Sequence, residues 1–146
     1  MDKIKHRLMQ ENSTEIFDWS ENTILIGEDE HINFRLLEVM LAKTRVKILR
    51  GKNGLETFQL FQANPQIDLI LMDIKMPEMD GCEVTREIRK VNKSIPIIAQ
   101  TAYALEEEKE KSLEAGCTAY ITKPINKKDL LILIDEKIHK NINNAI

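Results

Sequence analysis

Five short apolar segments, separated by stretches in which apolar residues recur at helical spacing, constrain the fold of this chain more than any other feature. The segments span residues 23–26, 46–49, 69–72, 95–99 and 119–122. The first, third and fourth are continuously apolar, which is typical of parallel strands that are covered on both faces. This alternation of strands and helices predicts an α/β protein with a doubly wound parallel sheet between helix layers.

The predicted helices lie between these segments, and four of them carry an apolar stripe. The stripes consist of Ile32, Leu36, Val39 and Met40, flanked by Leu37 and Leu41; of Leu55, Phe58 and Phe61; of Val84, Ile88 and Val91; and of Leu130, Leu131, Ile134 and Ile138. Residues 105–115 contain few apolar side chains. We therefore expect a short, solvated helix there that is loosely held to the sheet.

Length and composition predict one globular domain with a short extension. The chain has 146 residues, of which 42% are hydrophobic and 31% charged, as in ordinary soluble domains. We expect the domain to span residues 22–142 and residues 1–21 to form an N-terminal extension or linker. In that extension, Ile4 and Leu8 can share one side of a short helix and Trp19 can pack against the domain; a tail without such contacts is an equal alternative.

Charge and hydropathy exclude several classes of function. A net charge of -3 gives no reason to expect binding to nucleic acid or to an anionic membrane surface. No apolar run is long enough to cross a bilayer, and the basic first ten residues lack the apolar segment of a secretory signal. We therefore expect a cytoplasmic protein, in which Cys82 and Cys117 are reduced structural thiols.

Polar residues that can carry chemistry follow the predicted strands. They are Glu28, Asp29 and Glu30 after the first strand, Asp73 after the third, Thr101 after the fourth, and Lys123 and Pro124 after the fifth. In a doubly wound sheet, ligands bind outside the carboxyl ends of the strands, so these side chains are expected at one edge. Clustered carboxylates repel one another and need a cation, and a set of oxygen ligands suits Mg²⁺.

Each of these residues alone has a simpler interpretation. An acid at the start of a helix is usually a cap or a solvated charge, and a lone Lys123 is usually a surface lysine. Asp73 differs because a carboxylate that closes a buried apolar segment is costly unless it has a purpose. The coincidence of all of them at successive strand ends favours a functional site.

With these residues in place, the chain resembles the receiver domains of response regulators and hybrid histidine kinases over about residues 22–139. The matching segments are residues 24–30, 71–81, 97–102 and 119–124, in order and each at a predicted strand end. The resemblance implies a flavodoxin-like fold with a five-stranded parallel sheet in the order 2-1-3-4-5 and five flanking helices.

The resemblance also implies a phosphoacceptor with a metal ion beside it. Asp73 corresponds to the aspartate that takes a phosphoryl group from a phosphohistidine. Asp29 corresponds to a direct Mg²⁺ ligand and Glu28 to one that acts through water, with Asp73 and the backbone carbonyl of Lys75 completing the protein ligands. Glu28 stands where an aspartate is more usual, which is a common variant of the site.

Three further positions match family residues that act on the phosphoryl group or respond to it. Lys123 corresponds to the lysine that pairs with phosphoryl oxygens, and its bond to Pro124 to a cis peptide. Thr101 and Tyr120 correspond to the switch hydroxyl and the switch aromatic. A weaker hypothesis is that Lys75 and Tyr103 flank the phosphoryl group and hinder its hydrolysis; side chains that simply point into solvent are the alternative.

The function implied by the resemblance is that of a phosphorylatable signalling domain, not an enzyme, although it assists its own phosphotransfer and dephosphorylation. The expected partner is a histidine kinase or a histidine phosphotransfer domain. Phosphorylation is expected to switch the face formed by the fourth helix, fifth strand and fifth helix, where a target or a second copy of the chain would dock. Residues 94–104 look more like hybrid-kinase receivers, yet a stand-alone regulator remains an alternative, and the cognate kinase, signal, oligomeric state and target are open.

Three rival functions are less well supported by the residues. A phosphatase of the haloacid dehalogenase type needs a second acid two residues after the nucleophile, where this chain has Lys75. A degenerate receiver that acts only as an interaction module would lack the acids, Asp73 or Lys123, and all are present. A flavin-binding module of the same strand order is disfavoured by the acidic loop that follows the first strand.

Overall fold

The computed structural model describes residues 17–102 and 106–145. The strands are β1 (Thr23–Gly27), β2 (Lys47–Gly51), β3 (Leu69–Asp73), β4 (Ile97–Ala102) and β5 (Ala119–Lys123). The helices are α2 (His31–Leu41), α3 (Gly54–Ala63), α4 (Gly81–Val91), α5 (Glu106–Ala115) and α6 (Lys127–Ala145), with a short 3-10 helix at Ala42–Thr44. Ile4, Leu8, Tyr103 and Leu105 lie outside the described residues, so the expectations for them stay predictions.

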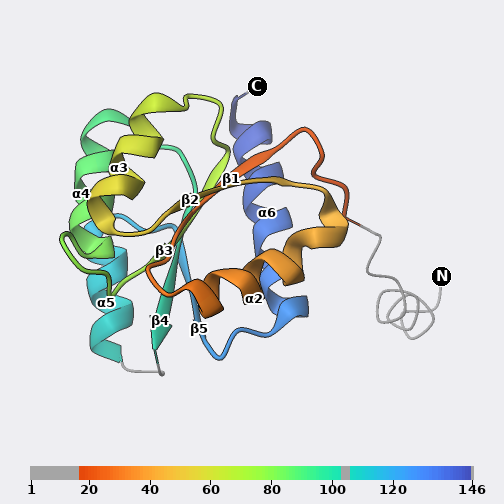
Figure 1. The fold of residues 1–146 in the computed structure, drawn as a ribbon. Helices are drawn as coiled ribbons and strands as arrows, with labels where there is room; N and C mark the ends of the chain where they lie inside the picture. Colours follow the sequence, from red (N-terminus) through yellow and green to blue (C-terminus); the bar gives the residue numbers. More distant parts are fainter. Residues whose placement is uncertain (1–16, 103–105, 146) are drawn as a thin grey trace.

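All four strand pairs are parallel, and the sheet has the order β2-β1-β3-β4-β5. Helices α2 and α6 cover one face, and α3, α4 and α5 cover the other (Figure 1). The predicted doubly wound α/β fold, its strand order and its five flanking helices are therefore confirmed. Parallel strands run in one direction, so the carboxyl ends of all five strands meet at one edge of the sheet.

Two apolar cores, one on each face, hold the helices to the sheet. Neighbouring residues of a strand contribute to opposite cores, because side chains alternate along a strand. Ile24 and Ile26 of β1 pack with α2 and α6, while Leu25 packs with the core that includes Val84 and Ile88 of α4. The central strands are thus covered on both faces, which explains their continuously apolar sequences.

Helix α2 does not use the apolar stripe that its sequence predicted. Its core-facing residues are Phe34, Leu37 and Leu41, whereas Ile32 is 74% exposed and Val39 64% exposed. The helix carries two apolar stripes at helical spacing, and spacing alone does not tell which of them faces the sheet. The prediction was wrong on this point, and the correction leaves an apolar surface on the outside of α2.

The other helices follow their predicted stripes more closely. Leu130, Leu131, Ile134 and Ile138 of α6 are all buried, as are Val84 and Ile88 of α4, whereas Leu55 of α3 and Val91 at the end of α4 are exposed. In the described residues of α5 only Ser112 and Ala115 are buried. The expectation of a short, solvated helix is therefore confirmed, and how loosely it is held to the sheet stays a prediction.

The segment before β1 packs onto the domain. Trp19 is only 2% exposed and lies in the core beneath α6, where its Nε1 donates a hydrogen bond to Asp135 Oδ1 over 3.2 Å. Its backbone N–H donates to the carbonyl of Thr44, and the ring of Phe17 lies 5.4 Å from that of Trp19. Of the two alternatives for Trp19, packing against the domain is confirmed.

Cys82 and Cys117 are both free and buried, and Cys117 contacts the hydroxyl of Thr85, as expected for structural thiols. Among the described helices, none combines the length and the hydrophobicity that a membrane span requires.

Candidate functional site

The carboxyl ends of β1, β3 and β5 bring four of the predicted residues together. Glu28 and Asp29 follow β1, Asp73 ends β3, and Lys123 ends β5. One carboxylate oxygen from each of the three acids lies within 4.8 Å of the others. Helix α4 begins directly against this group, because a Cβ on Gly81 would lie 2.3 Å from the carbonyl oxygen of Asp73.

Asp73 is contacted on both of its carboxylate oxygens. Lys123 Nζ donates to Oδ2 over 3.2 Å, and the backbone N–H of Lys75 donates to Oδ1 over 3.2 Å. Lys123 Nζ also lies 3.6 Å from Glu28 Oε1. Although burial of Lys123 opposes its charge, the carboxylates of Asp73 and Glu28 raise its pKa above the usual value, so the lysine stays cationic at neutral pH.

The surroundings of Glu28 disfavour the ionised form of its carboxyl group. Its side chain is fully buried, and burial together with the charge of Asp73 raises its pKa to about 7, against the opposing effect of Lys123. One ammonium group therefore does not neutralise the acids. Three carboxylates close to one ammonium group leave a net negative charge and several oxygen ligands at this place. A hard divalent cation fits such a set, so the residues present suit Mg²⁺.

Arg50, at the end of β2, is a residue of this site that sequence reasoning missed. Its Nε donates to the carbonyl of Glu28 over 3.1 Å and its Nη2 to the carbonyl of Asp29 over 3.3 Å. The guanidinium lies 4.8 Å from the ring centre of Phe34, which holds it in place. It fixes the backbone of the two acids. The sequence carries no signal for this contact, because Arg50 bonds to backbone carbonyls and stands between Leu49 and Gly51 as an ordinary strand-end residue.

The predicted switch residues lie on neighbouring strands. Thr101 on β4 is fully buried, and its hydroxyl has no hydrogen-bond partner among the described residues. Tyr120 on β5 is 37% exposed, with Lys109 Nζ of α5 lying 5.0 Å from its ring centre. The hydroxyl is thus free to accept or donate a new bond, and the aromatic ring lies at the surface.

Some predicted residues do not join the cluster. Glu30 is exposed and its carboxylate accepts a bond from Asn33 instead. The Lys75 side chain forms an ion pair of 3.4 Å with Glu108 of α5. The Lys123–Pro124 peptide is cis, as the resemblance implied.

The sheet carries three acids and a lysine at its carboxyl edge, and no glycine-rich phosphate loop follows β1. The site is therefore that of an α/β signalling domain and not that of a dinucleotide-binding domain. The chain belongs to the response regulator receiver domain family, whose model matches residues 24–135. It is therefore a receiver domain, a signalling domain of two-component systems.

Relatives occur both as small regulators and within large kinases. The chain is 38% identical to the polar-differentiation response regulator DivK of Brucella anthropi over 71% of this chain and 85% of that protein. It is 39% identical to hybrid signal transduction histidine kinase I of Dictyostelium discoideum over 82% of this chain, but it spans only 7% of that kinase.

Solved structures show the same fold. A CheY-like receiver from Methanospirillum hungatei is 31% identical with a TM-score of 0.76, over 84% of this chain and 98% of that one. The Ssk1 receiver of Saccharomyces cerevisiae, solved with the histidine phosphotransfer protein Ypd1, is 31% identical with a TM-score of 0.69, over 80% of this chain and 86% of that one.

Proposed function

We propose that Asp73 accepts a phosphoryl group from a phosphohistidine of a histidine kinase or a histidine phosphotransfer domain. The observation that carries the proposal is the convergence of one ammonium group and two further carboxylates on the Asp73 side chain. The carboxylate closes a buried strand yet stands at the open edge of the sheet, so a phosphodonor can reach it. The Ssk1 receiver, which was crystallised with a histidine phosphotransfer protein, supports this kind of partner.

Magnesium is the cofactor that the site would hold. Asp29, Glu28, Asp73 and the backbone carbonyl of Lys75 are the proposed ligands, with Glu28 acting through water. When bound, Mg²⁺ supplies positive charge against a phosphoryl oxygen and removes the repulsion among the acids. The metal preference follows from the donor set, which contains only oxygen atoms.

The residues of the chain account for the rest of the transfer. A carboxylate oxygen of Asp73 forms a bond to phosphorus while the bond from phosphorus to the donor imidazole breaks, and the imidazole keeps the electron pair. Lys123 neutralises charge on one phosphoryl oxygen, and the Thr101 hydroxyl with a backbone N–H receives another. The transition state of such a transfer is loose, so positioning and charge neutralisation provide most of the rate.

The output is a change in the face formed by α5, β5 and α6. Movement of Thr101 toward the new charge would leave space for Tyr120 to turn inward, away from Lys109. Helix α5 is held by few buried side chains, so it can change its packing at a small cost in free energy. We propose that a target, or a second copy of the chain, docks on this face, where Leu113 and Ile132 are exposed.

Incubation of the full chain with Mg²⁺ and phosphoramidate, a small phosphodonor, tests the phosphoacceptor assignment. Mass spectrometry should show the addition of one phosphoryl group, located on the peptide that contains Asp73 and removed by hydroxylamine, as expected for an acyl phosphate. An unmodified chain, or a group carried elsewhere, would refute the proposal.

The stability of the metal-free protein is expected to fall as the pH rises. The pKa of Glu28 is about 7 in the folded protein against an ordinary 4.5, so between these values the folded state binds more protons than the unfolded state. Stability is then present at low pH and lost as the pH rises through 7. Thermal unfolding from about pH 5 to about pH 8 should show this decline, with Glu28→Gln as the variant that lacks it; a decline of equal size in both proteins contradicts the assignment to Glu28.

Replacing Arg50 with Gln is expected to weaken Mg²⁺ binding by about tenfold, because residues that orient metal ligands affect affinity on this scale. The two carbonyls would lose their donors and the acids would lose their fixed backbone. Calorimetric titration with Mg²⁺ measures the effect. Arg35→Gln, which removes an exposed guanidinium paired with Glu38 on α2, is the matched control, and equal affinities in the two variants would show that Arg50 does not position the acids.

A further inference from the structure

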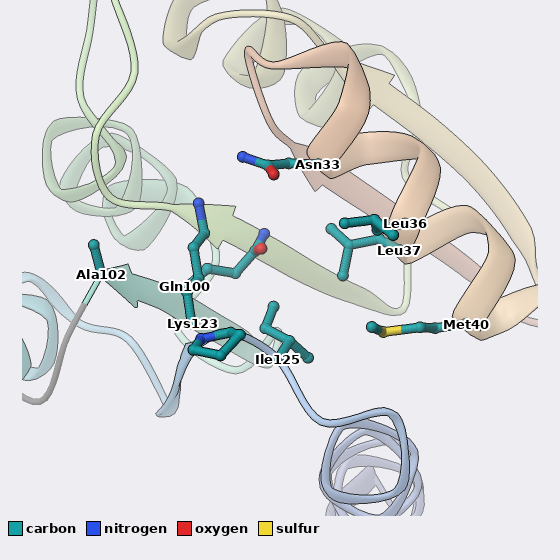
Figure 2. A pocket seen from close by; sticks show the side chains of 9 residues that line it. Asn33, Leu36, Leu37, Met40, Gln100, Ala102, Lys123 and Ile125 are labelled. Atoms are coloured by element: carbon teal, nitrogen blue, oxygen red, sulfur yellow. The ribbon is translucent and has the colours of Figure 1, made fainter.

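An apolar groove lies open between α2 and the connection from β5 to α6. It encloses about 410 Å³, and its walls include Leu36 and Met40 of α2 and Ile125 of the connection. Figure 2 shows the α2 side chains facing Ile125 across the space. Leu36 is 54% exposed, and Ile32 and Val39 extend the exposed apolar surface along the outside of α2. A continuous apolar surface beside a hollow usually marks a place that another segment or molecule covers.

One end of this groove lies where the described chain begins. Met40 stands in the last turn of α2, and the backbone N–H of Trp19 donates to the carbonyl of Thr44, just after that helix. Phe17, Met40 and Ile125 pack against the same apolar core as Trp19. The chain that precedes Phe17 therefore starts beside the last turn of α2, at the Met40 end of the groove.

Residues 1–16 are long enough to follow the groove to its other end. Ile4 and Leu8 are four residues apart, so they can share one side of a helix. Even as a helix, which rises about 1.5 Å per residue, the chain places them about 20 and 14 Å from Phe17. Helix α2 has 11 residues and is therefore about 16 Å long. Both side chains can reach the groove along its length.

The charges of residues 1–10 complement those at the far end of the groove. That end is formed by Lys123, whose charge is already paired with Glu28 and Asp73. Three acids against one lysine leave a net negative charge there. Residues 1–10 carry three Lys or Arg side chains and one acid. A chain that enters the groove at Met40 brings this basic part toward the acid cluster, where opposite charges attract.

We propose that residues 1–16 dock in this groove. Ile4 and Leu8 pack against its apolar walls, and the basic part of the segment lies toward the acid cluster. The segment then covers the apolar surface of α2, so another protein can use that surface only after the segment leaves. The contact is an autoinhibitory one within the chain. It goes beyond the proposed function and does not rest on it, because it forms without a phosphoryl group.

Nuclear Overhauser effects between methyl groups of the full, unphosphorylated chain test the contact directly. Cross-peaks are expected between Leu8 and Leu36, and between Ile125 and either Ile4 or Leu8. A mixture of chains that carry different isotope labels reveals contacts between two copies, because cross-peaks then join different molecules. The proposal is overturned if Ile4 and Leu8 give no cross-peak to the groove, or if the cross-peaks join only different molecules.

Broadening by a soluble gadolinium chelate shows whether the segment covers the groove. The variant Ile4→Glu/Leu8→Glu places two charges against apolar walls, so its segment should leave the groove. The broadening of the Leu36 and Ile125 methyl signals should then rise about threefold, as expected when a mostly docked segment is released. The methyl signals of Leu113, which is exposed on α5 on the other face of the sheet, should not change.

Gln10→Glu/Ser13→Glu is the matched control. It adds the same two charges, but on the side of a helix opposite to Ile4 and Leu8. Its broadening should equal that of the unchanged chain. Equal broadening in all three chains would show that the segment does not cover the groove, and an equal rise in both variants would show that its apolar side does not hold it there. Either result contradicts the proposal.

A peptide of residues 1–16 should dock from solution on the ¹⁵N-labelled Ile4→Glu/Leu8→Glu chain. The backbone amides of Leu36 and Ile125 should shift with a Kd of roughly 1 mM, since a linked segment has an effective concentration in this range and a much weaker contact would leave the groove open. The peptide that carries both Glu substitutions should bind at least about tenfold more weakly, because two apolar contacts are lost. Equal affinities of the two peptides, or no saturable shift at these amides, would refute the docking of this segment.

Discussion

Replacement of Asp73 with Asn is expected to abolish phosphorylation of the chain. The amide keeps the size of the side chain but is a very poor nucleophile and removes the negative charge that pairs with Lys123 Nζ at 3.2 Å. Labelling by phosphoramidate in the presence of Mg²⁺ should fall by about three orders of magnitude or more, the scale seen when a nucleophile is removed from an enzyme. Mass spectrometry of the intact chain measures it directly.

Asp68→Asn is the matched control. Asp68 lies just before β3, at the opposite end of the strand that Asp73 closes, and its carboxylate accepts hydrogen bonds from Asn22 and from the backbone N–H of Thr23. It should keep full labelling with a modest loss of stability. Retained labelling in Asp73→Asn would move the phosphoacceptor to Glu28 or Asp29 and refute the assignment, provided that circular dichroism shows both variants folded.

The fold was predictable because its main signal is local. Continuously apolar segments occur where strands are covered on both faces, and β1, β3 and β4 are the strands with such sequences. The faces of the helices were less predictable. Helix α2 carries apolar residues on more than one side, so which side is buried depends on the sheet beneath it and not on the sequence of the helix.

The sequence allowed the acid cluster to be predicted, because the geometry of a parallel sheet brings its residues together. It did not allow the residues that support the cluster to be predicted. Residues that follow parallel strands must meet at one edge, which places Asp29, Asp73 and Lys123 together once the strands are known. Arg50 acts through contacts to backbone carbonyls, which carry no sequence pattern.

The buried indole of Trp19 changes the view of the N-terminal extension. The sequence predicted that residues 1–21 precede a domain of residues 22–142, and that boundary remains a proposal. The last part of the extension is nevertheless attached to the domain. The contacts are the buried side chain of Trp19, the ring of Phe17 beside it, and the ion pair of Asp18 with Arg45. Residues 17–19 therefore belong to the folded domain, at the end of the sheet opposite the acid cluster.

Trp19→Ala is therefore expected to lower the free energy of unfolding by about 3–5 kcal/mol, the usual cost of removing a large buried aromatic side chain. A domain of this size is stable by roughly 5–15 kcal/mol, so the variant should unfold at a much lower urea concentration. Trp19→Phe keeps an aromatic side chain but loses one ring of the indole and the hydrogen bond to Asp135, and it should cost less than Trp19→Ala. Circular dichroism in urea measures both variants.

Phosphorylation separates this structural role from a role in the chemistry. Trp19 lies before β1 and the acid cluster lies after it, so the folded fraction of Trp19→Ala should be labelled by phosphoramidate at the rate of the unchanged chain when both are kept cold. If Trp19→Ala lowered the free energy of unfolding by less than about 1 kcal/mol, as a surface substitution does, Trp19 would not contribute to the stability of the domain. A slower labelling rate in the fully folded variant would instead show that the segment before β1 communicates with the opposite edge of the sheet through α6.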